Sequence, residues 1–360
     1  MILSFKASNF RCLKEAELVF GPDFNLIYGA NASGKTSLLE ALAYLGRGKS
    51  FRGASLSNLV RHGHDEFVLF GQVQAESRRL AVGVRNSRSG LEVRVDGESD
   101  GGAAALAEAL PLQVIDPEVH NLVAGGPDQR RRYLDWVAFH VEHDHLLTWR
   151  RFRRALKQRN AALKSGAAAA AIGSWNAEFV AVSDALDESR RRALAVVGES
   201  LRGFGDELLG TELGFEYQQG WKKGSDLQQA LEAGIERDVA LGATQHGPHR
   251  ADVKVSYDER QARKLVSRGQ QKLLASAMIL AATETAQTAL ERRLVLLLDD
   301  PAAELDKKSL HRLMGAVDRL GCQVIATSLD AGSLGPPEGA VVFHVEHGIL
   351  RLVNGDTPEI

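Results

Sequence analysis

The sequence has few cysteines and no long apolar run. Its two cysteines, Cys12 and Cys322, lie far apart and fit neither a metal-binding nor a disulfide pattern, so we expect a reducing, cytoplasmic environment. The longest strongly apolar run, residues 294–298, is far too short to span a bilayer. No apolar segment follows Lys6 or Arg11, so a signal peptide is not expected. These absences argue against a secreted or membrane-spanning protein.

A strong charge of one sign is also lacking. The formal net charge is −2 over 360 residues, so any contact with nucleic acid must come from local patches. The composition, 44% hydrophobic and 25% charged, is typical of a soluble globular protein of two or three domains. No heptad pattern is long enough to predict a long coiled coil. The function must therefore be inferred from motifs.

The strongest motif is the stretch GANASGKT, which fits the phosphate-binding pattern GxxxxGK(S/T). It follows a short apolar segment, residues 24–28, and precedes leucines at helical spacing that end near Gly46, a candidate C-terminal cap. A strand, a glycine-rich loop and a helix N-terminus together make an anion site. Lys35 would face the β- and γ-phosphates of a nucleotide, and Thr36 would ligate Mg²⁺. The candidate nucleotide-binding residues are Gly29, Ala30, Asn31, Ala32, Ser33, Gly34, Lys35 and Thr36.

A second nucleotide motif begins 270 residues after Gly29. The run 294–298 ends in Asp299 and Asp300, as a buried parallel strand does when it carries carboxylates to the edge where ligands bind. Asp299 would hold Mg²⁺ together with Thr36, and Asp300 would orient or deprotonate the attacking water. The alternative is that two acidic residues merely end a core strand. The presence of a phosphate loop favours the catalytic interpretation.

A third candidate site lies where a helix is expected to begin and run towards Leu290. Ser267 and Gln270 have the S-x-x-Q form of a capping box, which any helix can carry. The functional alternative is that Ser267, Gln270 and the exposed N–H groups of this helix bind an anion.

The stretch SRGQQ, residues 267–271, resembles the LSGGQ signature of ABC-type ATPases. Glu304-Leu305-Asp306 resembles the D-loop of the same proteins. In that family the signature of one subunit closes over the nucleotide bound by the other, so the resemblance implies a homodimer that forms with ATP. The long separation of the nucleotide motifs is similar to that in the SMC and DNA-repair group.

The chain also carries, in this order, Asn9-Phe10-Arg11, LQVIDPE (112–118), GGPDQRRRYLD (125–135), LKQRNAAL (156–163) and TQHGPHRAD (244–252). These stretches, in the same order, resemble the RecF family of recombination mediators. The resemblance implies an ATP- and Mg²⁺-dependent protein that binds double-stranded DNA near single-strand gaps and helps load RecA in gap repair, replication restart and the SOS response. Its implied partners are RecR, with RecO, and Arg11 joins the implied nucleotide-binding residues.

The implied fold is α/β, an ABC-type ATPase head with a P-loop and an antiparallel β subdomain, and with an inserted helical lobe. We expect residues 1–118 and 242–360 to form the head and residues 119–241 to form the arm, helical from about residue 129 onwards. Alternating apolar residues predict a hairpin over residues 82–95. Residues 166–174 are of low complexity and are expected to connect two helices.

Three positions depart from the ABC pattern. Asp300 stands where a catalytic glutamate is usual, and its shorter side chain predicts slow hydrolysis. Thr327-Ser328 replaces the switch histidine, so sensing of the γ-phosphate would depend on hydroxyl groups. Arg268 replaces the first glycine of the signature. These features suit a DNA clamp with slow, DNA-stimulated ATPase activity. The alternative function is the ATPase subunit of an ABC transporter, although no membrane partner is expected.

Basic residues are concentrated in the expected arm. Between Asp128 and Lys164 there are ten Lys or Arg and four Asp or Glu, and Arg159 belongs to the densest part. These residues either contact DNA phosphates or form the solvated face of a helix. His249 and Arg250 receive no role beyond a turn. The candidate DNA-binding residues are Lys49, Arg52, Arg150, Arg151, Arg153, Arg154 and Lys157.

Overall fold

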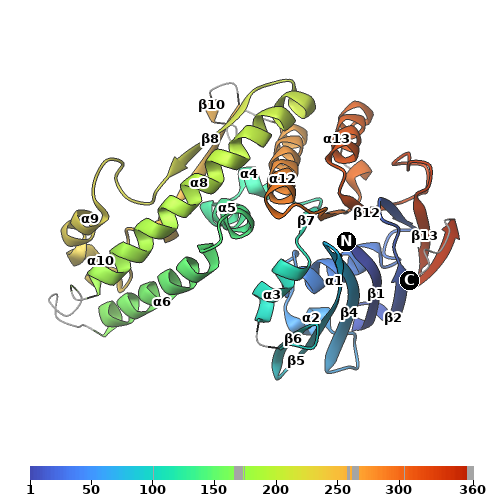
Figure 1. Cartoon of the computed structure of the whole chain (residues 1–360), viewed down its shortest axis with the longest axis horizontal. Coiled ribbons are helices and arrows are strands. Elements are labelled where there is room, and N and C mark those ends of the chain that lie inside the picture. Colours follow the sequence, from blue (N-terminus) through green and yellow to red (C-terminus); the bar gives the residue numbers. More distant parts are fainter. Residues whose placement is uncertain are drawn as a thin grey trace. The chain divides into compact units, whose positions relative to one another are not determined.

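The structure is a computed structural model of the whole chain. Packing divides the described residues into two compact units, Met1–Val119 with Glu291–Ile360 (unit 1) and His120–Leu290 (unit 2) (Figure 1). Glu304 of the expected D-loop, and all of the expected connection at residues 166–174 except Gly173, lie outside the described residues. The residues that the structure does not describe are Asp100, 166–172, Ser174, 258–259, 262–266, Glu304 and 355–360.

A six-stranded sheet in the order β14-β13-β3-β12-β11-β7 forms the centre of unit 1. All of its strands except β14 run parallel, so their C-terminal ends meet at one edge. β7, β11 and β12 are buried at every residue, and β11 is apolar throughout, as expected of a buried parallel strand. The strands are β3 (Phe24–Tyr28), β7 (Leu112–Ile115), β11 (Val295–Leu298), β12 (Gln323–Ser328), β13 (Val341–Glu346) and β14 (Ile349–Asn354).

A second, antiparallel sheet of unit 1 has the order β2-β1-β4-β5-β6. The hairpin predicted over residues 82–95 is confirmed, because β5 and β6 pair with Val82 opposite Val95. Helix α1 (Lys35–Arg47) contacts strands of both sheets and shares one apolar core with them. The strands are β1 (Ile2–Phe10), β2 (Leu13–Val19), β4 (Glu66–Ala75), β5 (Arg78–Ser87) and β6 (Gly90–Val95).

Gly46 lies inside α1 and does not end it, so its predicted capping role is wrong. The helix ends at Gly48, whose φ of 63° is the left-handed conformation of a C-terminal cap. Gly46 instead permits a close approach to the segment around β7. A Cβ on Gly46 would lie 2.8 Å from the backbone oxygen of Leu110 and 2.6 Å from Leu112 Cδ2.

The remaining helices of unit 1 are short, except for the one that follows the expected D-loop. That helix, α13, begins after Asp306, whose carboxylate accepts hydrogen bonds from the backbone N–H groups of Lys308 and Ser309, each at 3.0 Å. The elements are α2 (Leu56–Leu59), α3 (Gly102–Ala109), η2 (Pro301–Ala303) and α13 (Lys307–Leu320).

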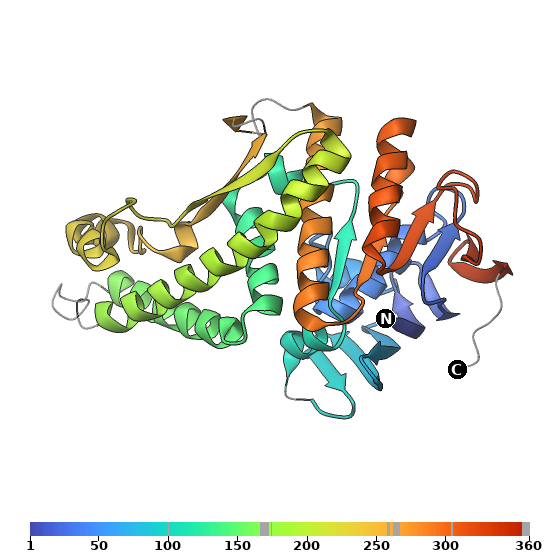
Figure 2. The same ribbon diagram turned by 45° about the horizontal axis from the view of Figure 1, so that its top comes forward.

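Unit 2 is built on helices, of which α6 and α8 lie side by side (Figures 1 and 2). One prediction for this region is wrong: residues 213–218 form strand β8, although the arm was expected to be helical throughout. β8 pairs with β9 some 40 residues later, and a local apolar pattern cannot reveal such a distant partner. The elements are α4 (Asn121–Ala124), α5 (Pro127–Val141), α6 (His145–Lys164), α8 (Asn176–Leu209), β8 (Leu213–Gln218), α9 (Leu227–Ala233), α10 (Ile235–Leu241), η1 (Pro248–Arg250), β9 (Asp252–Tyr257), β10 (Arg260–Gln261) and α12 (Arg268–Leu290).

The second packing boundary lies at residues 290/291, whereas the expected domain boundary was 241/242. The difference arises because α12 packs against α8 and α5, and the hydroxyl of Tyr133 donates a hydrogen bond to the backbone oxygen of Met278 at 3.0 Å. The functional assignment of residues 242–290 to the ATPase head stays a prediction. Among the described residues, α12 alone is long and apolar enough to cross a membrane, and 72% of its apolar window is buried inside the protein.

Substitution of Gly46 by alanine should destabilise the protein by about 1–3 kcal/mol, because the new methyl group meets a backbone oxygen that cannot move aside. Gly315 of α13 is the matched control. It is also inside a helix of unit 1, but a Cβ there meets nothing within 4 Å, so Gly315→Ala should be neutral or stabilising by about 0.5–1 kcal/mol. Urea unfolding followed by circular dichroism measures both variants. Equal stability of the two variants would show that the contact of α1 with the β7 segment tolerates a side chain.

Candidate nucleotide-binding site

Residues 29–34 join β3 to α1 at the edge where the parallel strands end, and Lys35 and Thr36 begin α1. Gly34 has a φ of 116°, which other residues rarely adopt, and it directly precedes α1. Within the described residues no side chain caps this helix, so the N–H groups of its first turn are left for another acceptor. Lys35 Nζ donates hydrogen bonds to the backbone oxygens of Gly29, at 2.6 Å, and Ala30, at 2.9 Å. The loop therefore curls around the lysine as a phosphate-binding loop does.

The two nucleotide motifs meet in the structure. Thr36 Oγ1 donates a hydrogen bond to Asp299 Oδ1 at 3.0 Å, and Thr327 Oγ1 donates to the same oxygen at 2.9 Å. Burial raises the pKa of the Asp299 carboxyl, although the hydroxyls of Thr327 and Thr36 and the charge of Arg52 oppose the shift. The contact brings together the pair of residues predicted to hold Mg²⁺. Their metal-binding role stays a prediction.

Asp300 follows with a left-handed backbone, at φ 47°, and is half-buried. Its N–H donates to Thr327 Oγ1 at 3.0 Å, which leaves its carboxylate as the group available for chemistry. Burial raises the pKa of Asp300, and Lys35 opposes the shift. Burial also lowers the pKa of the Lys35 ammonium, with Asp300 and Asp299 opposing. The lysine and both acids thus share one electrostatic environment.

The hydroxyl groups expected to replace the switch histidine already form hydrogen bonds within the protein. Thr327 is fully buried and donates to Asp299, and Ser328 Oγ donates to the backbone oxygen of Asp330. A role in sensing the γ-phosphate would require at least one of these bonds to rearrange.

Asp116 is a site residue to which the sequence analysis gave no role. It follows β7, and Ile115 pairs with Leu298, so Asp116 ends its strand at the level of Asp299. Burial raises the pKa of Asp116 to about 6. The negative charge of Asp299 adds to this shift, and the positive charge of Arg47 opposes it. A signal was present in the sequence, because the short stretch LQVI, like the apolar run before Asp299, is followed directly by an aspartate.

The structure shows which charged groups interact with two basic candidate residues of unit 1. Arg11 pairs with the buried carboxylate of Glu40, and its Nη2 donates to Oε1 at 2.9 Å. Arg52 is exposed, but it lies close enough to Asp299 for its charge to lower the pKa of that carboxyl. Arg52 was predicted to bind DNA, and its charge also acts on a carboxyl of the candidate nucleotide site. Lys49 is exposed.

The chain matches the family described as RecF/RecN/SMC N terminal domain over residues 1–348. It is 41% identical to the DNA replication and repair protein RecF of Chromohalobacter salexigens, over 92% of this chain and 93% of that protein. The chain belongs to the RecF family. The RecF protein of Edwardsiella ictaluri is 38% identical, over 96% of this chain and 98% of its own length.

Solved structures of this family share the fold. One described as the recombination mediator protein RecF-ATP in the RecFOR pathway has a TM-score of 0.89 at 25% identity, covering 98% of this chain and 97% of that one. A second, with RecF-ATPrS, has a TM-score of 0.87 at 26% identity and covers 98% of each chain. An Smc head bound to the C-winged helix domain of ScpA, at 14% identity and a TM-score of 0.59, shows the fold alone. The predicted ATPase-head fold is confirmed.

The candidate signature of the RecF-family chain is a capping box in unit 2. The N–H of Ser267 donates to Gln270 Oε1 at 2.9 Å, and the N–H of Gln270 donates to Ser267 Oγ at 3.3 Å. Both residues are exposed at the start of α12. The capping interpretation is therefore realised in the structure, and the binding of a nucleotide by Ser267 stays a prediction.

The basic residues of α6 divide between its two faces. Arg151 pairs with Glu178 at 2.9 Å, and the guanidinium of Arg153 lies 5.5 Å from the centre of the Trp149 ring. Arg159 is fully buried, so it cannot belong to a DNA-contacting surface with its neighbours in sequence. The candidate DNA-binding residues of this helix, all of them exposed, are Arg150, Arg151, Arg153, Arg154 and Lys157.

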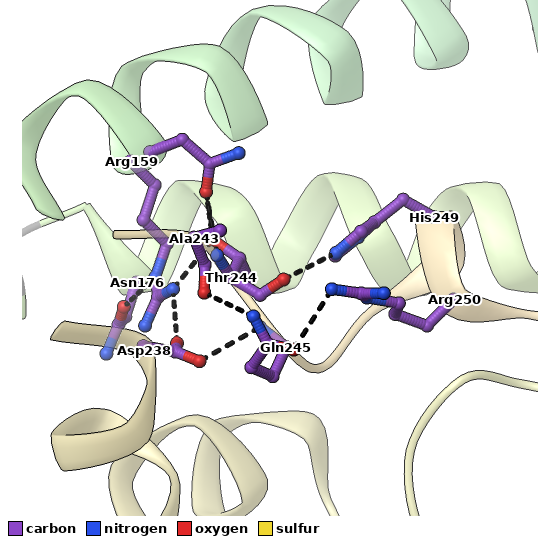
Figure 3. Close-up of polar contacts among 9 residues, drawn as sticks. Arg159, Asn176, Asp238, Ala243, Thr244, Gln245, His249 and Arg250 are labelled. Atoms are coloured by element: carbon purple, nitrogen blue, oxygen red, sulfur yellow. Dashed lines mark hydrogen bonds and ion pairs between the residues drawn. The ribbon is translucent and has the colours of Figure 1, made fainter. Parts of the chain in front are cut away.

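Arg159 instead joins four segments of unit 2 (Figure 3). Its Nη1 donates to Asp238 Oδ2 of α10 at 2.6 Å and to Thr244 Oγ1 at 2.8 Å, and its Nε donates to Asn176 Oδ1 of α8 at 3.1 Å. Asn160, the next residue of α6, accepts the backbone N–H of Thr244 at 2.8 Å. Hydrogen bonds thus hold the stretch TQHGPHRAD, residues 244–252, to the side of α6 that carries Arg159 and Asn160.

The same stretch is held by other arginines and by its own side chains. Arg190 Nη1 donates to the backbone oxygen of Pro248 at 2.8 Å, and Arg130 pairs with Asp252 at 2.7 Å. His249 Nε2 lies 2.9 Å from the backbone oxygen of Thr244, so this nitrogen carries the proton. The neutral histidine is therefore part of the turn (Figure 3).

Two histidines of unit 2 should make stability depend on pH. Burial lowers the pKa values of His145 and His249 to about 4 from their ordinary value of 6.5. Between pH 6.5 and 4 the unfolded chain takes up protons that the folded chain does not, so stability must fall as the pH falls through this range. The stability lost between pH 7 and pH 5 is about 1–2 kcal/mol for each histidine.

Urea unfolding at pH 7 and pH 5 measures this loss. The variant His145→Gln should lose less stability on acidification than the wild type, because glutamine does not titrate. His64, which is exposed, provides the matched control variant His64→Gln, which should behave as the wild type does. Identical acid sensitivity of His145→Gln and the wild type would contradict the prediction.

Proposed function

We propose that this RecF-family chain is an ATP-dependent, DNA-binding recombination mediator. It dimerises on ATP, binds double-stranded DNA near single-strand gaps and helps load RecA in gap repair, replication restart and the SOS response, in the cytoplasm. The contact of Thr36 Oγ1 with Asp299 Oδ1 carries the proposal, because it completes a nucleotide site from two distant motifs. Relatives named DNA replication and repair protein RecF, similar along nearly the whole chain, support it.

The residues of the site suit ATP with Mg²⁺. Ser33 Oγ is buried in the loop with no hydrogen-bond partner among the described residues, as expected where a phosphate oxygen completes the site. Thr36 and Asp299 offer a hydroxyl and a carboxylate, the oxygen ligands that Mg²⁺ prefers beside waters and phosphates. Bound Mg²⁺ would neutralise charge that develops on the phosphates. The similarity to a solved RecF-ATP structure supports this choice of nucleotide.

Hydrolysis would depend on Asp300. Asp300 is half-buried, and its charge interacts with those of Lys35 and Asp299, so we expect its carboxylate to orient a water molecule and accept its proton. Because aspartate is one methylene shorter than glutamate, its reach is shorter and we infer slow turnover. Slow turnover suits a clamp that holds DNA for a set time.

The site would be completed by a second protomer. Ser267 and Gln270 are exposed at the N-terminus of α12, where backbone N–H groups favour an anion. In an ABC-like dimer this helix end would face the γ-phosphate held by the partner's Lys35. The similar RecF-ATP structure is described as part of the RecFOR pathway, which supports RecR and RecO as the further partners of this chain.

The first experiment tests the composite site. Ser267→Arg should leave a folded protein that binds ATP, since loss of a cap costs only about 1 kcal/mol, but the cation should prevent ATP-driven dimerisation and almost all hydrolysis. Lys35→Met should be inactive because it lacks the charge beside the phosphates. In a mixed dimer one site carries both defects and the other is intact, so mixing should restore part of the ATPase activity.

The control places the same cation elsewhere. Ser89 is exposed in the turn between β5 and β6, and Ser89→Arg should dimerise and hydrolyse ATP as the wild type does. A Ser267→Arg protein that alone behaves like the wild type would contradict the composite site.

The second experiment tests the basic face of α6. Arg150 and Arg154 are exposed one helical turn apart, and replacing both by glutamine should weaken duplex binding on all sequences. The slope of log K against log salt should flatten by roughly one unit for each DNA phosphate that the variant no longer binds. Arg78 and Arg79 of β5, also exposed, provide the matched double variant, which should keep the wild-type slope. Equal slopes for the two double variants would show that Arg150 and Arg154 belong to a solvated helix face and do not contact DNA.

A further inference from the structure

One buried carboxylate of α1 joins two segments of unit 1. Glu40 is fully buried, although glutamate is almost never buried unless it is paired. Arg11, in the turn between β1 and β2, donates from Nη2 to Glu40 Oε1 at 2.9 Å, and its Nε pairs with Oε2. Ser50 Oγ, from the loop after α1, donates to Oε1 at 2.5 Å. None of the nucleotide motifs accounts for this arrangement.

The turn that Arg11 occupies lies against the phosphate loop. Cys12 Sγ is 3.2 Å from the position that a Cβ on Gly34 would take, and it is 3.4 Å from Ser37 Oγ in the first turn of α1. Arg61 Nη1 donates to the backbone oxygen of Cys12 at 2.7 Å and holds the turn from its other side. A change in the Arg11 pairing would therefore disturb the start of α1.

The loop that Ser50 begins carries Arg52. Ser50 Oγ accepts the backbone N–H groups of Arg52, at 3.0 Å, and Ala54, at 3.2 Å, so one hydroxyl closes this loop and ties it to Glu40. Arg52 is exposed on this loop. Glu40 thus fixes the start of the loop that carries Arg52.

We propose that Glu40 is a positioning residue for ATP hydrolysis, which fastens the Arg11 turn and the Arg52 loop to the helix that follows the phosphate loop. The inference rests on the ATPase function proposed above. Glu40 acts through Ser50 and through Arg11, which is itself a candidate nucleotide-binding residue.

Replacing Glu40 by glutamine removes the negative charge and keeps the shape of the side chain. The amide keeps the volume of the side chain and one oxygen that can accept a hydrogen bond from Ser50. Its NH₂ group, however, would stand where Oε2 pairs with Arg11 Nε, and a guanidinium can only donate. Glu40→Gln therefore cannot keep the whole Arg11 pairing, and one or both of the attached segments should loosen.

The test compares Glu40→Gln with Glu17→Gln. Glu17 of β2 pairs with Lys6 at 2.8 Å, but its side chain is 66% exposed, so its replacement should leave activity unchanged. In Glu40→Gln the kcat of ATP hydrolysis should fall about 10- to 100-fold, as for other displacements remote from the chemistry. A maleimide should also label the exposed Cys12 faster, with buried Cys322 as the internal reference. Wild-type kcat and wild-type labelling would overturn the proposal.

A double-variant cycle separates positioning from a purely structural ion pair. In an Arg52→Ala background, Glu40→Gln should lower kcat by a smaller factor than in the wild type, because one of the groups it positions is gone. Equal factors in the two backgrounds would overturn the proposal.

Ser50→Ala keeps the inference testable if Glu40→Gln does not fold. It removes the hydroxyl that ties the loop to Glu40 and closes the loop, and it leaves the Arg11 pair in place. It should lower kcat while Cys12 labelling stays at the wild-type rate, and an unchanged kcat would overturn the proposal. A wild-type protein that hydrolyses no ATP would instead contradict the proposed function, and Cys12 labelling would still show whether Glu40 holds the turn.

Discussion

The hydrogen bond between Thr36 and Asp299 is the contact on which the candidate nucleotide site depends. The two residues are 263 positions apart, and they meet because β3 and β11 both run parallel to β12 and end at the same sheet edge. This edge also receives Asp116 from β7. Parallel strands place their C-terminal residues together whatever their separation in sequence, so an inserted unit of some 170 residues does not disturb the site.

Unit 2 uses buried arginines in a different way. Arg159 and Arg190 fix the stretch around Thr244 and Pro248 by pairing with Asp238 and with a backbone oxygen. Buried ion pairs contribute little net stability, because desolvation offsets the attraction, but breaking one is costly. We infer that these arginines hold a single arrangement of the helices, which would keep the exposed cations of α6 in fixed positions for the proposed contact with DNA.

Local patterns predicted the parts of the fold that depend on neighbours in sequence. The phosphate loop, the buried runs before it and before Asp299, the hairpin of β5 and β6 and the capping box at Ser267 all follow from short-range chemistry. β8 did not, because its partner β9 is distant in the chain. The buried position of Arg159 was predictable in principle, since it shares the spacing of the buried residues Phe152, Ala155 and Leu163. The link through Glu40 joins segments with no common pattern, so the sequence alone could not reveal it.

In the proposed dimer, ATP completes each nucleotide site with a second copy of the chain. Light scattering of the wild-type protein, with and without ATP and Mg²⁺ and then with gapped duplex DNA, measures the mass of each species. We expect the mass of one chain without nucleotide, twice that mass with ATP, and a further increase equal to the bound DNA. A mass that stays unchanged at saturating ATP, in a protein shown to bind it, would contradict the composite site.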